Sequence, residues 1–172
     1  MAAKKNNVYS MIEVRESKIQ GKGVYAKKRI RKGQRIIEYT GELISQEEVD
    51  RRYDDDAMER HHTFLFEIDE NVTIDATHCG SDARWINHSC DPNCEALDED
   101  GRIWIFAKKN IQPGQELAYD YQYDVDEPLT PELKAQYPCY CGAKKCRGTI
   151  LKPKPPRRKK KKKAKEKKSG TR

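Results

Sequence analysis

The side chains best suited to chemistry gather in one stretch, residues 84–94 (RWINHSCDPNC). Eleven positions hold a guanidinium, two side-chain amides, an imidazole, a hydroxyl, a carboxylate and two thiols. A surface turn would not need the apolar Trp85 and Ile86 leading into it, and buried polar groups must find partners. The stretch therefore predicts a buried polar network at a binding or catalytic site. The simpler alternative is a polar turn that follows a short strand.

A second reactive group lies nearer the C-terminus, where Cys139, Cys141 and Cys146 fall within eight residues. The sequence shows no secretory signal, so we expect reduced thiols, and clustered thiols then indicate a metal site rather than disulfides. Three thiolates leave a tetrahedral zinc site one ligand short. The candidates for the fourth ligand are the remaining cysteines and the histidines: Cys79, Cys90, Cys94 and the four His residues.

The glycines and tyrosines are weaker signals when each is taken alone. Gly21 and Gly23 could let backbone approach a ligand closely, but a plain hairpin turn explains them equally well. They lack the third glycine and the following helix of a dinucleotide-binding motif, which disfavours a Rossmann site. Tyr119, Tyr121 and Tyr123 alternate along one segment, and the simplest interpretation is the half-buried face of a strand.

Short β-prone segments must position these groups. Alternation and turn residues predict strands over residues 8–14, 34–39, 62–68, 72–75, 102–107 and 116–123. A capping box at Ser45 and Glu48 predicts one helix running to about Arg60. Residues 124–138 resemble an acidic, proline-containing connector. Many short strands with one or two short helices imply a mainly β fold of small sheets.

Charge divides the 172 residues into an acidic globule and a basic tail. Residues 152–172 contain thirteen Lys and Arg and one acidic residue, a net charge of +12, so the other 151 residues carry −5 of the total +7. Such a low-complexity tail is expected to be disordered and to bind nucleic acid or acidic surfaces. No apolar run reaches the length of a membrane span, and we expect an intracellular protein.

Together these motifs resemble the SET-domain protein lysine methyltransferases with a post-SET cysteine motif. The resemblance spans residues 8–151 and rests on five motifs in family order. They are residues 21–25 (GKGVY), 38–42 (EYTGE), 84–93, 116–121 (ELAYDY) and the Cys-x-Cys-x4-Cys trio. The implied fold is a β-clip of small sheets with a pseudoknot, in which the stretch around Asn87 threads beneath a loop. The implied domains are SET (8–127), connector and post-SET zinc motif (128–151) and disordered tail (152–172).

The resemblance also implies the residues of the site. Tyr121 would be the catalytic tyrosine, with Tyr39 and Tyr119 lining a channel for the target lysine. The cofactor S-adenosylmethionine would be bordered by residues from four segments: Lys22, Gly23, Tyr25, Tyr53, Arg84, Asn87 and His88. One structural zinc ion would be shared by four thiolates: Cys90, Cys139, Cys141 and Cys146. The remaining cysteines, Cys79 and Cys94, are assigned to packing.

The implied activity is S-adenosylmethionine-dependent protein-lysine N-methylation of a histone or another basic, DNA-associated protein, mainly to monomethyl-lysine. Tyr119 would set that limit, unless another channel residue such as Phe106 does. Acidic residues within 47–56 and 98–100 would attract a lysine-rich peptide. The expected location is the nucleus or nucleoid, or a host nucleus if the protein is bacterial. The alternative is a non-catalytic DNA-binding or chromatin-compacting protein that uses its basic tail, with the SET fold as scaffold.

Overall fold

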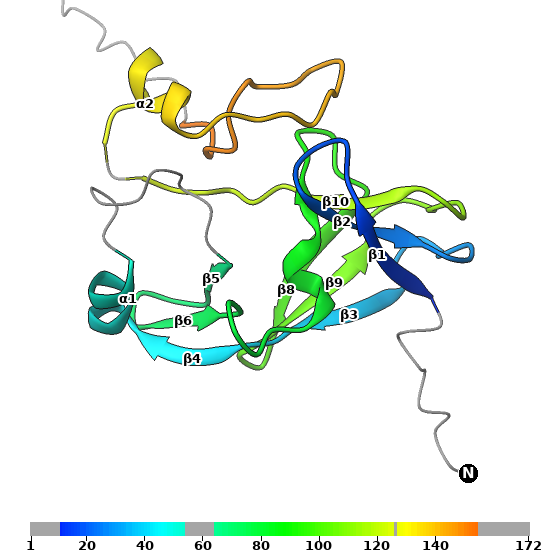
Figure 1. The fold of residues 1–172 in the computed structure, drawn as a ribbon, viewed down its shortest axis with the longest axis horizontal. Coiled ribbons are helices and arrows are strands. Elements are labelled where there is room, and N and C mark those ends of the chain that lie inside the picture. The colour runs from blue at the N-terminus through cyan, green and yellow to red at the C-terminus, as the bar shows by residue number, and fades with distance from the viewer. Residues whose placement is uncertain (1–10, 54–63, 126, 155–172) are drawn as a thin grey trace, which may run out of the picture.

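The structure is a computed structural model, and it describes residues 11–53, 64–125 and 127–154. These residues form three small β-sheets, two short α-helices and a short 3-10 helix, η2 (Asp82–Trp85) (Figure 1). This confirms the prediction of a mainly β fold with one or two short helices. Within the described residues, no helix is long and apolar enough to cross a membrane.

The first sheet brings together three of the predicted motifs. Its strand order is β1 (Ile12–Glu16), β2 (Lys22–Ala26), β10 (Glu116–Tyr119) and β7 (Asn87–His88). β2 runs antiparallel to β1 and β10, whereas β7 pairs in parallel with β10 and sets Asn87 opposite Ala118 and His88 opposite Tyr119. The glycine pair, the polar stretch and the tyrosine segment therefore share one sheet.

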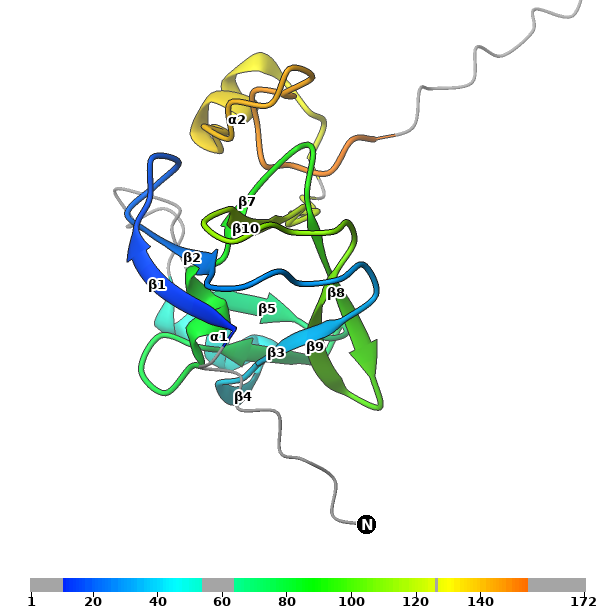
Figure 2. The same cartoon turned by 90° about the vertical axis from the view of Figure 1, so that its right-hand side faces the viewer.

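The other two sheets are antiparallel. One has the order β3 (Arg35–Tyr39), β9 (Arg102–Ala107), β8 (Cys94–Glu99), and the other β4 (Glu42–Ser45), β6 (Val72–Asp75), β5 (Leu65–Glu67). Figure 2 shows β3 and β9 below the β2 and β10 level of the first sheet. The side chains buried most completely between the elements are mainly branched and aliphatic, and include Ile30, Ile36, Ile86, Ile105, Ile111 and Leu117. Burying each contributes about 1.5–3 kcal/mol to the hydrophobic stabilisation.

Two predicted elements end earlier than expected. The capping interaction forms, since the Ser45 hydroxyl accepts from the Glu48 N–H at 3.3 Å, but α1 (Gln46–Arg52) ends where Tyr53 leaves the helical conformation. The prediction that this helix continues to Arg60 is wrong, because the helix has already ended before Tyr53. Residues 54–63 lie outside the described part of the chain. The strand predicted over 116–123 stops at Tyr119, and it could not continue to 123 because Gln122 adopts a φ of 52° that an extended strand does not accommodate.

The predicted connector contains a helix that was missed. α2 (Pro131–Gln136) begins at Thr130, whose hydroxyl accepts from the Leu133 N–H at 3.2 Å, and has proline in its first turn. A threonine cap followed by proline is a helix-start signal that was present in the sequence.

The segment after α2 folds back onto the residues that follow β10. Leu151 forms a parallel bridge with Tyr123, Pro138 bridges Thr149, and the Lys152 N–H donates to the Tyr123 carbonyl at 2.8 Å. Leu151 is 1% exposed. Both views show this segment on the β10 side of the molecule (Figures 1 and 2).

Candidate active site and cysteine cluster

Four aromatic rings meet where the three sheets converge. The Tyr119 ring lies 4.9 Å from that of Tyr121 and 6.4 Å from that of Phe66, and the Phe66 ring lies 5.3 Å from that of Tyr39. Tyr39 comes from β3, Phe66 from β5 and Tyr119 from β10, so all three sheets contribute. The structure therefore brings together the three tyrosines that the sequence pointed to, and it adds Phe66.

The hydroxyls of this cluster have different surroundings. Tyr39 donates to the Phe64 carbonyl at 3.0 Å, and Tyr121 donates to the Ile86 carbonyl at 2.8 Å. Tyr119 is 8% exposed, and its hydroxyl makes no hydrogen bond to another described residue. Burial raises the pKa of all three phenols above the usual value of 10, so all three remain protonated donors at neutral pH.

Asn87 fixes the backbone of the glycine pair. Its side-chain amide donates to the carbonyls of Lys22 at 2.9 Å and Gln20 at 3.3 Å, and to Oε1 of Glu116 at 2.9 Å. Asn87 is 7% exposed, so these bonds are largely shielded from water. Within the described chain no donor reaches its Oδ1, which leaves one acceptor for a ligand.

Glu116 is the centre of the same network and was not singled out from the sequence. Its carboxylate also accepts from the Ser17 hydroxyl at 2.7 Å and from the Tyr25 hydroxyl at 2.9 Å. A Cβ added at Gly23 would lie 2.2 Å from Glu116 Oε1, so only glycine lets this carboxylate approach β2. Gly23 is thus explained by packing against Glu116, whereas Gly21 has open space around it and a left-handed φ of 46° that favours glycine.

Two cations lie over the ring of Trp85. The Lys22 ammonium is 4.7 Å and the Arg84 guanidinium 4.8 Å from the ring centroid. Arg84 also donates to the carbonyls of Ala76 at 2.8 Å and Thr77 at 3.0 Å, while its Nε is buried without a partner among the described residues.

Tyr53 also contacts Thr77, in the turn after β6 whose carbonyls bind Arg84. Its hydroxyl donates to Asp75 Oδ2 at 2.9 Å and lies 2.8 Å from the Thr77 hydroxyl. Asp75 also accepts from Arg52 at 3.0 Å. Tyr53 and Arg84, which are 31 positions apart in the sequence, are therefore linked through Thr77.

His88 connects the tyrosines to the cysteines. Its Nδ1 accepts from the Tyr121 N–H at 3.1 Å, and its Nε2 lies 3.4 Å from the Cys90 sulfur. Burial, with a smaller contribution from the Arg147 charge, lowers the pKa of His88 to about 4, against the opposing effect of Asp120. The imidazole is therefore neutral at neutral pH, which Nδ1 needs in order to accept.

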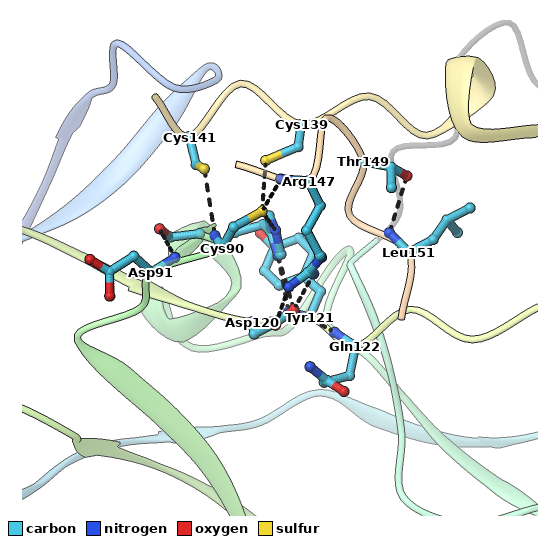
Figure 3. Close-up of polar contacts among 12 residues, drawn as sticks. Cys90, Asp91, Asp120, Tyr121, Gln122, Cys139, Cys141, Arg147, Thr149 and Leu151 are labelled. Atoms are coloured by element: carbon cyan, nitrogen blue, oxygen red, sulfur yellow. Dashed lines mark hydrogen bonds and ion pairs between the residues drawn. The ribbon is translucent and has the colours of Figure 1, made fainter. Parts of the chain in front are cut away.

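Four thiols form one cluster, and Figure 3 shows three of the four residues, Cys90, Cys139 and Cys141. The sulfurs of Cys90, Cys139, Cys141 and Cys146 all lie within 4.8 Å of one another. Backbone N–H groups point at three of them, from Arg147 to Cys90 at 3.4 Å, from Gly148 to Cys146 at 3.3 Å and from Cys90 to Cys141 at 3.5 Å. These four residues are a chemically suitable donor set for a metal ion such as Zn²⁺.

The other two cysteines lie outside this cluster. Cys94 is 1% exposed and packs in the core, as expected. Cys79 is exposed, so its assignment to packing is wrong. It lies in a turn after β6, where cysteine is not buried.

An ion pair that the sequence analysis missed joins the cysteine segment to β10. Arg147 donates to both carboxylate oxygens of Asp120, at 2.7 and 2.8 Å. Arg147 directly follows the last cysteine of the trio and Asp120 lies between two of the tyrosines, so both belong to the predicted motifs. The sequence offered no signal that the two side chains meet.

Several of the acidic residues expected to attract a basic peptide already have partners. Glu48 pairs with Arg51 and Arg52, and Glu99 pairs with Arg35. These pairs reduce the local negative charge available to a substrate. Asp54, Asp55, Asp56 and the histidines His61 and His62 lie outside the described residues.

Comparison with known proteins places this geometry in a family. Residues 21–122 match the SET domain, and this region includes β2, β7 and β10 of the site. The matched region is more than half of the chain.

Similar proteins match a larger share of the chain. The chain is 43% identical over 147 residues to histone-lysine N-methyltransferase trr of Drosophila melanogaster and 40% identical over 147 residues to histone-lysine N-methyltransferase 2D of Homo sapiens. It is 42% identical over 139 residues to the histone-lysine N-methyltransferase, H3 lysine-4 specific, of Schizosaccharomyces pombe. These alignments cover 83%, 83% and 78% of this chain but 6%, 2% and 14% of the relatives. The chain thus corresponds to a small part of each relative, and it belongs to the SET domain family.

Proposed function

We propose that this chain is an S-adenosylmethionine-dependent protein-lysine N-methyltransferase. The observation that carries the proposal is the cluster of three protonated tyrosine hydroxyls beside Asn87 and His88, in a chain that belongs to the SET domain family. Methyl transfer to an amine is a direct displacement, for which positioning and electrostatics supply most of the acceleration.

The residues around Asn87 fit the cofactor. When bound, S-adenosylmethionine supplies an electrophilic methyl group on a sulfonium. The Oδ1 of Asn87, which no donor among the described residues reaches, is an acceptor that suits an ammonium donor, and Trp85 with its two cations forms an aromatic and polar border. The residues that would hold the cofactor are those expected from the resemblance: Lys22, Gly23, Tyr25, Tyr53, Arg84, Asn87 and His88.

The tyrosine cluster would bind and orient the lysine amine. A free lysine titrates near ~10.4 and must lose its proton to act as a nucleophile. An aromatic environment disfavours the ammonium form and therefore lowers the pKa of the bound lysine. The hydroxyl oxygens of Tyr119 and Tyr121 can accept from the N–H groups of the neutral amine, which leaves the lone pair of the amine free to face the methyl group. The Tyr39 and Phe66 rings would exclude water.

We further propose one structural zinc ion held by Cys90, Cys139, Cys141 and Cys146. The support is the donor set itself, since four sulfurs lie within 4.8 Å and backbone N–H groups point at three of them. Zinc bound there would cross-link the end of β7 to the C-terminal segment.

The main product would be monomethyl-lysine. Tyr119 supports this, because its largely buried hydroxyl is not committed to another described residue and can hold the amine or a trapped water. A second methyl group would have to displace that hydroxyl or water, which costs free energy when the lost bonds are not replaced.

The substrate would be a histone or another basic, DNA-associated protein. The support is that relatives 40–43% identical are named histone-lysine N-methyltransferases. The +12 charge of residues 152–172 suits nucleic acid as a second partner, and a location with chromatin or nucleoid DNA would follow. That tail also favours the second candidate function, a DNA-binding protein with the SET fold as scaffold.

Transfer of radiolabel from the cofactor onto mixed histones tests the proposal. We expect label on lysine with the unchanged protein and a labelling rate lower by about 100-fold or more with Tyr121→Phe. DNA binding without any labelling by the unchanged protein would instead support the scaffold function.

A further inference from the structure

We infer that Asp120 and Arg147 form a positioning pair, which docks the cysteine segment onto the end of β10 and thereby fixes the backbone of Tyr121. This inference rests on the proposed function for its catalytic consequence. Its structural consequence is independent of activity and can be measured separately.

The geometry of the pair fixes one orientation. Arg147 donates two parallel bonds to the Asp120 carboxylate, at 2.7 and 2.8 Å, and the two side chains are 23% and 18% exposed (Figure 3). A bidentate guanidinium–carboxylate contact is planar and directional, unlike a lysine ion pair. It sets both the distance and the angle between the cysteine segment and β10.

Asp120 also accepts a hydrogen bond within the turn that contains Tyr121, so its position affects the backbone of that turn. Its Oδ1 accepts from the Gln122 N–H at 3.2 Å, and Gln122 has a left-handed φ of 52°, which is strained for a residue with a side chain. The same oxygen lies 3.6 Å from Nδ1 of His88, the atom that accepts from the Tyr121 N–H. The carboxylate therefore supports the peptide group after Tyr121 directly, while His88 holds the peptide group before it.

The pair is better suited to orientation than to stability. Arg147 Nε is buried without a partner among the described residues, an unfavourable feature that a purely stabilising contact would avoid. Partly buried ion pairs often contribute little more to stability than an apolar contact would, but they exclude other arrangements.

Docking by this pair is separable from metal binding. The contact of Arg147 with the Cys90 sulfur uses its backbone N–H, which remains when the side chain is replaced. A variant can therefore keep all four thiols and lose only the ion pair.

The experiment compares Arg147→Ala, Arg147→Lys, Asp120→Asn and the double variant Asp120→Asn/Arg147→Ala. The matched control is Lys109→Ala, which breaks an exposed pair with Asp91, the residue after Cys90. Three quantities are measured: bound zinc per chain, hydrogen exchange of the Tyr121 and Gln122 amides, and kcat and KM for a histone peptide.

We expect Arg147→Ala to retain the metal content of the unchanged protein, to exchange the Tyr121 and Gln122 amides at least tenfold faster, and to lower kcat at least tenfold with a smaller change in KM. Arg147→Lys should show a smaller increase in amide exchange and a smaller fall in kcat than Arg147→Ala. The double variant should be no worse than the more impaired single variant, because the residues act as a unit. Lys109→Ala should stay within twofold of the unchanged protein.

Unchanged amide exchange in Arg147→Ala would overturn the inference, and so would loss of metal in Arg147→Lys, since docking and metal binding would then not be separable. Failure of the unchanged protein to methylate any histone or other basic, DNA-associated protein would refute the proposed function. The amide exchange would still decide whether the pair positions Tyr121.

Discussion

At the scale of single residues, the hydroxyl of Tyr121 is already bonded to the Ile86 carbonyl, which belongs to the residue just before β7. The same hydroxyl oxygen keeps acceptor capacity while it donates. The Tyr121 hydroxyl can therefore act in two ways: it holds the backbone just before Asn87, and it can contact a ligand. Its ring is held independently, against Tyr119 at 4.9 Å and His88 at 5.3 Å.

The first prediction concerns this hydroxyl. Tyr121→Phe keeps the ring contacts but removes one positioned hydroxyl, whose oxygen would accept from the amine, so we expect methyl transfer to fall by about 100-fold or more. The lost bond to Ile86 should cost about 1 kcal/mol of stability. Cofactor binding by calorimetry should be nearly unchanged in the same sample that is assayed for turnover. Turnover close to that of the unchanged protein would show that another group organises the amine.

A second residue-scale prediction concerns product number. Tyr119→Phe should preserve the first transfer and shift the products toward di- and trimethyl-lysine, because a water held without the hydroxyl leaves more readily. A change of ~1.4 kcal/mol in the barrier alters the rate of the second transfer tenfold. The products are measured by mass spectrometry at long reaction times.

Phe106 provides the control for this prediction, since it was the alternative residue for the limit. In the structure Phe106 lies on β9 beside the Arg35 guanidinium, at 5.7 Å, whereas the ring beside Tyr119 is that of Phe66. Phe106→Leu should therefore leave the product pattern unchanged. Trimethyl-lysine as the dominant product of the unchanged protein would refute the role of Tyr119.

At the scale of elements, residues 137–151, which contain the three clustered cysteines and are all described by the structure, include no helix or strand of their own. Among their described contacts are the Pro138–Thr149 bridge, the Leu151–Tyr123 bridge and the Tyr137–Tyr123 ring contact at 5.2 Å. Metal binding to such a segment supplies folding free energy directly.

We therefore predict that Cys141→Ser releases the metal and loosens residues 137–151, as seen by faster hydrogen exchange there. Cys79→Ser is the matched control, because Cys79 is exposed and outside the cluster, and it should keep one zinc per chain. Metal analysis is decisive: protein purified without chelator and found to contain no zinc would contradict the proposed site.

The elements that the sequence predicted best are those with strong local patterns. The strands at 72–75 and 102–107 match β6 and β9 to the residue, because β-branched and aromatic residues alternate there between clear turns. β8 was missed, since Leu97 is its one large aliphatic residue among acidic neighbours, and its strand form depends on pairing with β9. Such pairing is a tertiary effect that a local pattern does not contain.

The same distinction between local patterns and tertiary contacts holds for the residues of the candidate site. The tyrosines and the four thiols could be assembled from motif order, and the structure brings each set together. The roles of Glu116 and Arg147 could not be predicted, because each depends on partners that are distant in the sequence. Glu116 meets Ser17, 99 positions away, and Arg147 meets Asp120, 27 positions away.

At the scale of the whole molecule, the basic tail starts beside the candidate site. Lys152 pairs with Asp124, and the Lys154 ammonium donates to the carbonyls of Val125 and Glu127 at 2.5 and 2.7 Å. Residues 152–154 are therefore attached to the segment that follows Tyr121. A deletion meant to remove the tail alone should begin after Lys154.

The last prediction is that tail and globule act on different partners. Residues 155–172 carry eleven Lys and Arg and one acidic residue, so they should bind DNA with a log–log salt dependence of several units from released counterions. The chain ending at Lys154 should lose this binding, measured by fluorescence anisotropy between low and physiological salt, yet methylate a short histone peptide with unchanged kcat. A variant with every tail lysine replaced by arginine is the control, because it keeps the charge and should keep DNA binding. DNA binding that survives the truncation would place the basic surface on the globule, whose net charge is negative, and would contradict this division of roles.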